Sequence, residues 1–404
     1  MNIGMIFDKH FPPDIRVEKE ARSLAKGGHR VYIFSKGKGS DPEEEKREDF
    51  EIVRFNANKY KTLKSFARDY KIITFQNPVW KRGIEYFVKK YDINAIHVHD
   101  LPFVKTAYAV AKKYSIPIIA DYHENFPAHI QALSGQDLTL KEKYYRSYSR
   151  WAKYEENISH KVDRIIVVAE EYKDHLIKEH HVPAGKITIV QNTIDLNIFD
   201  DALKNMNDVS VDSTDEFILS YVGSYGVHRG LDVVVEAMPK ILSQIPEAKL
   251  VIVGRGTNKE QLLQIARDLE VEDSVKFDEW VPYEKLISEF KRASIGLIPH
   301  HSSEHTDNTI PNKLFEYMYF KIPLLVSDCP PLKRIVDETK AGKVFKAGDA
   351  QDFGEKVLKI YHDPDNYGEM GNKAVVEKYN WDVDSRNLVD LYKSVESDLH
   401  KLQN

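Results

Sequence analysis

The sequence predicts an α/β fold with two doubly wound, Rossmann-like domains facing across a cleft. Short β-branched runs alternate with helical patterns along all 404 residues, which is typical of parallel sheets built from βαβ units. The chain is also long for a single core, and 42% of its residues are hydrophobic, so two domains of ordinary size are expected. A polar stretch at 200–217 interrupts the alternation and is the best candidate for a linker.

Each predicted strand is a short run rich in Val, Ile, Phe and Tyr. In the first domain, residues 1–200, the runs are 2–7, 30–35, 51–55, 94–99, 116–121, 164–169 and 187–191. In the second domain, residues 217–380, they are 217–223, 249–254, 275–278, 295–299, 322–327 and 342–345. We expect residues 381–404 to form a helix that packs back toward the first domain. Ligands of such folds bind beyond the carboxyl ends of the strands.

Composition excludes several classes of protein. The formal net charge is −5, whereas a dedicated nucleic-acid binder is usually basic, so no nucleic-acid partner is expected. Cys329 is the single cysteine, which fits a reducing cytoplasm. The first residues, "MNIGMIF", resemble a strand rather than a signal peptide, and no apolar run reaches the length of a membrane span. We therefore expect a cytoplasmic protein.

The stretch 305–328 combines a polar loop, a short helix and an apolar strand. Pro311 marks the predicted helix start, so the N–H groups of Asn312, Lys313 and Leu314 would be free to bind an anion. Glu316, one turn later, could accept hydrogen bonds from ribose hydroxyls. The alternative is a capped surface helix with an i, i+3 ion pair, and this stretch alone favours neither.

A second stretch, 221–237, contains a strand, a glycine-rich turn and a helix. Gly223 and Gly226 free the backbone, and Arg229 at the helix start is a bidentate donor for an anion. Two anion sites in one domain favour a diphosphate ligand. Neither stretch is a Walker loop or a GxGxxG fingerprint. The third glycine turn, at Gly254 and Gly256, is weaker and favours a simple tight turn.

These motifs belong to a series that spans nearly the whole chain. The later ones are "VGSYGVHRGLDVVVEA", "VIVGRG", "VKFDEWVPYEKL", "ASIGLIP" and "IPNKLFEYMYFKIPLLVSD". The earlier ones are "FPPDIRVEKEARSLAKGGHRVYIFS", "IHVHDLP", "DYHENFP" and "QNTIDLNIF". In their order and spacing the chain resembles the retaining glycosyltransferase family 4, which has the two-domain GT-B fold. The resemblance implies an N-terminal acceptor-binding domain and a C-terminal domain that binds a nucleotide-sugar donor.

The resemblance also implies roles for individual residues. Arg229 and Lys313 match residues that hold the donor diphosphate. Glu316 matches the ligand of the ribose, and His123 matches a histidine near the transferred sugar. The predicted catalytic residues are His123, Arg229 and Lys313. The other predicted donor-binding residues are Gly223, Ser224, Gly254, Trp280, Val281, Asn308, Thr309, Ile310, Asn312, Leu314 and Glu316. The predicted acceptor-binding residues are Asp14, Arg16, His99 and His123.

The chain departs from the family pattern at several positions. Asn308 stands where the first Glu of the Glu–seven residues–Glu motif is expected, and Ser224 where an arginine is common. The interdomain loop has Thr193 and Ile194 in place of Gly-Val. The first loop lacks paired glycines and carries Asp14 and Arg16, which we expect to face the acceptor.

Other acidic and histidine clusters favour structural roles. "DPD" at 363–365 and "DVD" at 382–384 are typical of helix starts rather than metal sites. For His97, packing within the strand is favoured over zinc, whereas His99 at the strand end could line the cleft. Asp121 flanks His123, and strand alternation could turn it away. We expect no metal, no cofactor and a structural role for Cys329.

The segment 59–91 is basic and rich in aromatics, although the chain is acidic. It predicts either peripheral docking on the anionic inner face of a membrane or a solvated helix pair that covers the sheet. Both interpretations stay open.

Together these features predict metal-independent, retaining transfer of a hexose-type sugar from a nucleotide diphosphate sugar to a hydroxyl of a saccharide or lipid-linked acceptor, in cell-surface polysaccharide or glycolipid synthesis. Attack from the front face, with a leaving phosphate oxygen taking the acceptor's proton, is the mechanism that the resemblance implies. The alternatives are a nucleotide-sugar 2-epimerase-like isomerase, which needs no acceptor, and a non-catalytic nucleotide-sugar binding module. Asn308 carries no charge and predicts a donor other than plain glucose, namely an N-acetylated, deoxy or uronic sugar.

Overall fold

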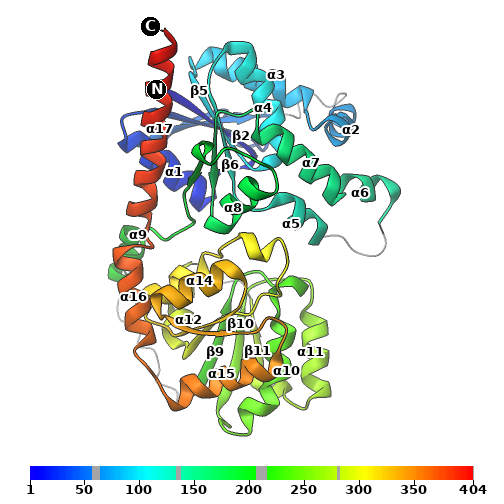
Figure 1. Cartoon of the computed structure of the whole chain (residues 1–404), viewed down its shortest axis with the longest axis vertical. Coiled ribbons are helices and arrows are strands. Elements are labelled where there is room, and N and C mark those ends of the chain that lie inside the picture. The colour runs from blue at the N-terminus through cyan, green and yellow to red at the C-terminus, as the bar shows by residue number, and fades with distance from the viewer. Residues whose placement is uncertain (57–63, 133–137, 206–215, 280–282, 404) are drawn as a thin grey trace. The chain divides into compact units, whose positions relative to one another are not determined.

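The chain folds into two compact α/β units. The computed structural model describes residues 1–56, 64–132, 138–205, 216–279 and 283–403. The first unit comprises Met1–Gln191 and Asp384–Asn404, and the second comprises Asn192–Val383. Each unit is built on a sheet with helices packed against it (Figure 1). The predicted fold class, two doubly wound α/β domains, is confirmed.

The sheet of the first unit has the order β3-β4-β2-β1-β5-β6-β7-β8 and is parallel except at the β3–β4 pair. Its strands are β1 (Asn2–His10), β2 (Arg30–Lys36), β3 (Glu44–Lys46), β4 (Phe50–Phe55), β5 (Ala95–His99), β6 (Ile118–Tyr122), β7 (Arg164–Val167) and β8 (Ile187–Ile189). Helices cover both faces of a parallel sheet, so its strands are largely apolar, and each of these except β3 coincides with a predicted run. The sequence analysis missed β3 because "EEK" has no apolar residue.

The helices of the first unit connect these strands. They are α1 (Ile15–Lys26), α2 (Lys64–Thr74), α3 (Pro78–Lys90), α4 (Leu101–Tyr114), α5 (Phe126–Ala132), α6 (Leu140–Tyr145), α7 (Tyr148–Ser159) and α8 (Glu170–Lys178). Local caps fix where they start: the side chain of Asp14 accepts a hydrogen bond from the N–H of Val17 at the start of α1, at 3.0 Å. The core contains Ile6, Val98 and Ala120 of the central strands, all with no exposed surface.

The sheet of the second unit is wholly parallel, with the order β11-β10-β9-β12-β13-β14. Its strands are β9 (Phe217–Val222), β10 (Ala248–Val253), β11 (Val275–Asp278), β12 (Ile295–Ile298), β13 (Leu324–Ser327) and β14 (Gly342–Phe345). Its helices are α9 (Leu196–Asn205), α10 (Leu231–Leu242), α11 (Lys259–Asp268), α12 (Tyr283–Arg292), α13 (Lys313–Tyr319), α14 (Pro330–Thr339), α15 (Ala350–His362) and α16 (Tyr367–Glu377). All six strands coincide with predicted runs.

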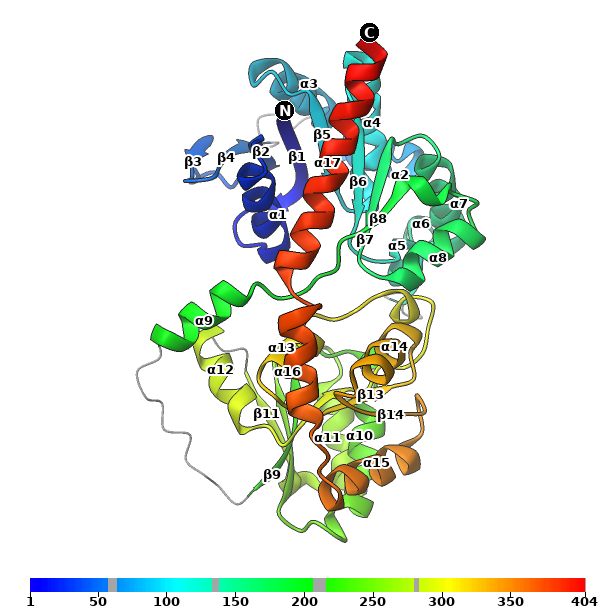
Figure 2. The ribbon, with the colours of Figure 1, turned by 60° about the vertical axis from the view of Figure 1, so that its left-hand side comes forward.

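The last helix, α17 (Trp381–Gln403), returns the chain to the first unit, to which its residues from Asp384 onward belong. Figure 2 shows this helix beside the first sheet. The hydroxyl of Tyr392 lies 2.9 Å from Nδ1 of His97 on β5, so the end of the chain contributes a buried polar contact to the centre of that sheet. No helix within the described ranges is long and apolar enough to cross a membrane.

The predicted linker at 200–217 needs correction at its amino end. The two units divide after Gln191, and α9 continues to Asn205, into the stretch that seemed unstructured. Phe199 of α9 is 5% exposed and its ring lies 5.2 Å from that of Tyr319, and the hydroxyl of Tyr319 donates to Asp200, so these contacts hold the helix against the second unit. Residues 206–215 lie outside the described part of the chain.

Candidate active site

In the second unit, two glycines shape the turns that follow neighbouring strands. Gly223 follows β9 with φ +123°, and Gly254 follows β10 with φ +150°. A Cβ at Gly254 would lie 2.1 Å from the carbonyl oxygen of Gly223, so both the backbone conformation and the close approach require glycine there. The two turns therefore meet at the carboxyl edge of the sheet, where ligands of doubly wound folds bind.

Lys313 points its ammonium group at this edge. Its Nζ lies 3.3 Å from the ring centroid of Tyr221 on β9, and a Cβ at Gly223 would be 3.6 Å from it. The side chain is buried, and Nζ has no hydrogen-bond partner among the described residues. Burial and the nearby charge of Arg229 hold the pKa of Lys313 well below its usual range, against the opposing effect of Glu316. An anion placed here would relieve that destabilisation.

Arg229 supplies a second cation beside Lys313. It ends the 3-10 turn Val227–Arg229, and its Nη1 donates to Nε2 of His300 at 3.0 Å. Burial, together with the charges of Arg229 and Lys313, lowers the pKa of His300 well below its usual range, so this imidazole is neutral and accepts the bond. Nε of Arg229 is buried without a hydrogen-bond partner in the described structure.

These buried, unpartnered nitrogens define the candidate donor site. A native protein seldom leaves a buried charged donor without a partner, and such a group points to a missing ion or ligand. Charge-assisted bonds from a lysine and an arginine suit an anion with several oxygens, above all a phosphate. The prediction that Arg229 and Lys313 serve one anion is thus consistent with their positions, while their catalytic role stays a prediction.

The start of α13 differs from the predicted arrangement. The helix begins at Lys313, and the N–H of Leu314 donates to the carbonyl oxygen of Pro311 at 3.1 Å. The expectation that the N–H of Leu314 is free is therefore wrong, because the turn formed by Pro311 and Asn312 already uses it. Glu316 is half-buried on the same helix and close enough to Lys313 to oppose the fall of its pKa.

Asn308 turns part of its amide toward the protein itself. It is 7% exposed and ends the turn Thr306–Asn308, and its Nδ2 donates to the carbonyl oxygen of Glu304 at 2.7 Å. One donor of this side chain therefore stabilises the loop. Thr309 and Ile310 continue from it toward α13, and Ile310 is 3% exposed.

For three further predicted donor residues, contact with the donor stays a prediction. Ser224 is exposed, and its carbonyl oxygen accepts a hydrogen bond from the hydroxyl of Tyr221 at 2.7 Å. Trp280 and Val281, predicted to contact the nucleobase through their backbone, lie outside the described residues.

In the first unit, His99 and His123 meet at the carboxyl edge of the sheet. Asp121 joins them: its Oδ2 lies 2.7 Å from Nε2 of His123 and 3.1 Å from Nδ1 of His99. The expectation that strand alternation turns Asp121 away from His123 is wrong, because residues two apart along an extended chain lie on the same side.

Two carboxylates set the charge of His123. Burial lowers its pKa, but Asp121 and Asp100 outweigh burial and raise the pKa of His123 to about 9. Burial and the neighbouring His97 lower the pKa of His99 to about 3. At neutral pH, His123 is therefore a cation and a hydrogen-bond donor, and His99 is neutral.

Arg16 was predicted to face the acceptor, but its side chain is buried within the first unit. Its guanidinium is 5% exposed and pairs with two carboxylates, Asp121 at 2.8 Å and Glu20 at 3.0 Å. Burial raises the pKa of Asp121, but the charges of Arg16 and His123 outweigh burial and hold this pKa well below its usual range. Asp14 is half-buried and caps α1, as described above; its predicted contact with an acceptor stays a prediction.

Sequence reasoning missed Glu20, Asp121 and Tyr392 as members of this network. The signal was present for Glu20, since Arg16 and Glu20 are four residues apart on one helix and can pair. Glu20, His97, His99 and Asp121 lie close enough to hold a metal ion. Arg16 already contacts both carboxylates, so we assign this cluster to a hydrogen-bonded network around His123.

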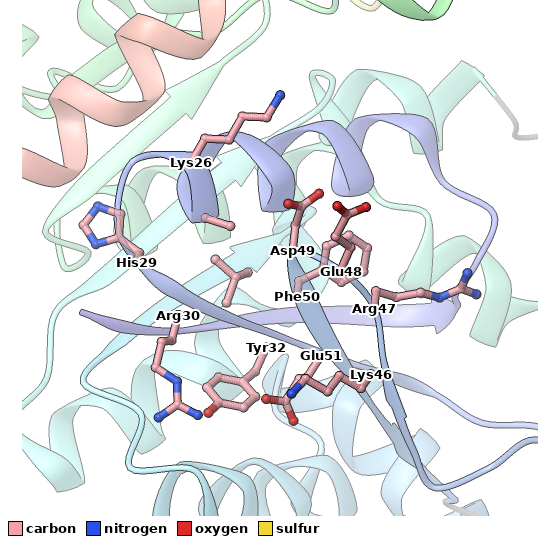
Figure 3. Close-up of a pocket in the computed structure, with 12 residues that line it drawn as sticks. Lys26, His29, Arg30, Tyr32, Lys46, Arg47, Glu48, Asp49, Phe50 and Glu51 are labelled. Carbon is pink, nitrogen blue, oxygen red and sulfur yellow. The ribbon is translucent and has the colours of Figure 1, made fainter.

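A separate cavity of about 300 Å³ lies at the amino end of β2 and β4, away from His99 and His123 (Figure 3). Acidic and basic side chains alternate around it, and some are already paired, as Asp49 is with Arg22 at 2.7 Å. We assign this cavity no role in the reaction.

The basic segment 59–91 contributes α2 and α3 to the first unit, with residues 57–63 outside the described part. Lys71 of α2 points inward, with Nζ 3.8 Å from the ring centroid of Phe103 and 3.8 Å from Asp8. At least this cation of the segment thus serves packing. Docking on a membrane stays a prediction, as does a cytoplasmic location.

Two sequence families match the chain, one in each unit. "Glycosyltransferase Family 4" matches residues 15–198, and "Glycosyl transferases group 1" matches residues 204–376. The D-inositol 3-phosphate glycosyltransferase of Streptosporangium roseum is 21% identical and aligns with 96% of this chain and 89% of its own length. The alpha-monoglucosyldiacylglycerol synthase of Streptococcus pneumoniae is 22% identical, with coverage of 90% and 86%.

Solved structures share the fold. The sucrose-phosphate synthase of Thermosynechococcus elongatus superposes with a TM-score of 0.77 at 19% identity, covering 98% of this chain and all of its own. Anabaena HepE in complex with UDP-glucose gives a TM-score of 0.71 at 12% identity, with coverage of 98% and 100%. With both units matched in sequence and fold, the chain belongs to glycosyltransferase family 4 and has the GT-B fold.

Proposed function

We propose that this glycosyltransferase transfers a hexose-type sugar from a nucleotide diphosphate sugar to a hydroxyl of a saccharide or lipid-linked acceptor, with retention and without a metal ion. The observation that carries the proposal is the pair Arg229 and Lys313 at the carboxyl edge of the second sheet: Nε of Arg229 and Nζ of Lys313 are buried without a hydrogen-bond partner among the described residues. The name of a relative such as alpha-monoglucosyldiacylglycerol synthase supports a lipid-linked acceptor, and we place the product in cell-surface polysaccharide or glycolipid synthesis.

The proposed chemistry is electrostatic. As the bond between the anomeric carbon and the diphosphate oxygen breaks, negative charge builds up on the diphosphate and positive charge on the sugar ring. Arg229 and Lys313 would stabilise the diphosphate, and each fixed donor of this kind contributes about 3 kcal/mol to lowering a barrier. The acceptor hydroxyl attacks from the face that the diphosphate leaves, and a diphosphate oxygen takes its proton, so the configuration is retained.

His123 has a different proposed role. As an imidazolium it cannot accept the acceptor's proton, so it is not a general base at neutral pH. It can donate a hydrogen bond to an oxygen of the transferred sugar. Asp121 and Asp100 would keep it charged, and Arg16 would hold Asp121 in place through their ion pair.

Incubation with a panel of UDP-, GDP- and ADP-sugars tests the function directly. Transfer to an added saccharide or glycolipid, with the anomeric configuration of the product read by NMR, is the expected result. Conversion of the nucleotide sugar without an acceptor would instead support the epimerase alternative. Binding without turnover across all acceptors would support a binding module.

The transfer rate is expected to persist in excess EDTA and to gain less than about twofold from Mg²⁺ or Mn²⁺. The reason is that Arg229 and Lys313 supply the charge that a metal supplies elsewhere. The measurement is the initial rate of the metal-stripped protein with and without each ion. Activity that disappears on stripping and returns only with Mg²⁺ or Mn²⁺ would contradict metal-free transfer.

The donor is expected to be an N-acetylated, deoxy or uronic sugar, because Asn308 places a neutral amide where relatives carry a carboxylate. Asn308→Glu should lower kcat/KM for a uronic donor more than tenfold, since the new carboxylate repels that of the sugar. Asn308→Gln is the matched control, because it keeps the amide and changes only its length. If wild type and Asn308→Glu prefer the same neutral hexose equally, Asn308 is only a loop-stabilising residue bound to Glu304.

A further inference from the structure

A second histidine–carboxylate cluster lies in the first unit, on α7, α8 and the segment that follows α8. It consists of Glu155, His175 and His180, whose nearest ligand atoms all lie within 4.8 Å of one another. Nε2 of His180 is 2.9 Å from Oε2 of Glu155, and Nε2 of His175 is 3.9 Å from the same oxygen. Both histidines thus turn a ring nitrogen toward one carboxylate oxygen.

These distances suit a small tetrahedral cation. Zinc bonds of about 2.0–2.2 Å to nitrogen and oxygen place neighbouring ligand atoms roughly 3.3 Å apart. The distances from Glu155 Oε2 to the two histidine nitrogens fall on either side of this value. All three ligand atoms lie within 4.8 Å of one another, so modest side-chain movements would bring them onto one ion.

The surroundings hold the carboxylate in the orientation that a metal ligand needs. The hydroxyl of Tyr172 donates to Oε1 of Glu155 at 2.6 Å, which leaves Oε2 for the histidines. Such outer hydrogen bonds to a ligand are typical of metal sites and stabilise them. Nε2 of His160 donates to the carbonyl oxygen of His180 at 2.8 Å, and this bond anchors the backbone of His180.

The burial of the cluster also favours a cation. Glu155 has no exposed surface, and a buried carboxylate needs strong compensation. The side chain of His175 is 13% exposed, so an ion and a water ligand can reach the site from solvent. The cluster of Glu20, His97, His99 and Asp121 differs, because there the cation of Arg16 already pairs with both carboxylates.

We propose that Glu155, His175 and His180 form a Zn²⁺ site with water as the fourth ligand. The ion joins α7 (Tyr148–Ser159), α8 (Glu170–Lys178) and the chain after α8, which lie together in the first unit (Figure 2). None of its ligands belongs to the donor site or to the His123 network. The site therefore stabilises the first unit and takes no part in sugar transfer.

The test uses the full chain after removal of metal by a chelator and dialysis. Titration with Zn²⁺ against a chromophoric chelator is expected to show one site per chain and a higher Tm. Glu155→Gln and His175→Ala should each weaken binding at least 100-fold and abolish the rise in Tm. Tyr172→Phe keeps all three ligands and should weaken binding about 10–100-fold, the effect typical of an outer partner.

His181→Asn is the matched control, because His181 is the exposed neighbour of His180 and asparagine tolerates its positive φ of 54°. It should bind Zn²⁺ like wild type. Partly exposed His175 can be replaced without unfolding the core, which keeps the test decisive if Glu155→Gln does not fold. Co²⁺ bound with the visible absorption of a tetrahedral site, lost in His175→Ala, would support the proposal. Failure of the wild type to bind Zn²⁺, or binding unchanged in His175→Ala, would overturn it, whether or not the protein transfers sugar.

Discussion

Lys313→Met is expected to lower kcat by about 10²–10³-fold while making the donor-free protein more stable. The first effect follows from losing one fixed donor to the developing diphosphate charge. The second follows because Lys313 is buried without a hydrogen-bond partner, a state that costs about 1–3 kcal/mol. Methionine keeps most of the apolar stem over Tyr221. Steady-state kinetics and thermal unfolding of the same variant measure both effects.

Arg229→Ala should lower kcat similarly, but without the gain in stability, because its Nη1 is bonded to His300. Lys333→Met is the control: Lys333 lies on α14 of the same unit and is exposed, with an ion pair to Asp337. It should change neither kcat nor stability appreciably. A Lys313→Met variant with near-normal kcat would place its charge outside the reacting site.

The rate of transfer is expected to stay high up to about pH 9 and to fall above it. The cause is His123, whose pKa Asp121 and Asp100 raise to about 9 against the effect of burial; loss of its proton removes the hydrogen-bond donor. Because the folded-state pKa lies above the ordinary value of about 6.5, its contribution to stability is complete below that pH. This contribution disappears as the pH rises through about 9.

Asp100→Asn should move the alkaline limb of the kcat profile to lower pH by about one unit, since Oδ1 of Asp100 lies 3.5 Å from Nδ1 of His123. Asparagine tolerates the φ of +65° found at this position. His123→Asn should remove the limb and lower kcat by about 10²-fold. In His123→Asn, the groups that face this position, namely Asp121, Asp100, Arg16 and His99, are unchanged. An alkaline limb that ignores Asp100→Asn would assign it to another group.

Asp121 is the wrong residue for that test, although its contact with His123 is shorter. Its carboxylate also pairs with buried Arg16, and removing one partner of a buried ion pair typically costs about 3–5 kcal/mol. Asp121→Asn is therefore expected to lose stability before it reports on His123.

The fold was predictable because periodicity alone determined it. Runs such as 250–253, "LVIV", are continuously apolar, as is typical of strands buried on both faces. The runs left one strand undetected, β3, because its acidic side chains lie at the antiparallel edge of the sheet and contribute nothing to the core. The linker was misplaced because tertiary contacts hold α9, such as those of Phe199 and Asp200 with Tyr319, and these leave no signal in the local sequence.

The site was predictable in part. Arg229 and Lys313 follow motifs that place them at the ends of strands, and in the structure Arg229 contacts the ring of His300 while Lys313 lies beside the turn at Gly223. The partners of His123 could not be predicted, because they come from α1, β5 and β6, and Tyr392 reaches His97 from nearly 300 residues away in sequence, a separation of 295. Such contacts depend on tertiary packing, which leaves no local pattern.

Calorimetric titration with UDP, GDP and ADP tests the central claim most directly, namely that Arg229 and Lys313 hold the donor diphosphate. The wild type should bind at least one of these nucleotides. Lys313→Met and Arg229→Ala should each weaken that binding about 10–100-fold, as expected for a hydrogen bond to a charged group worth about 1.5–3 kcal/mol, whereas Lys333→Met should bind like wild type. Equal affinity in all four proteins would contradict the account.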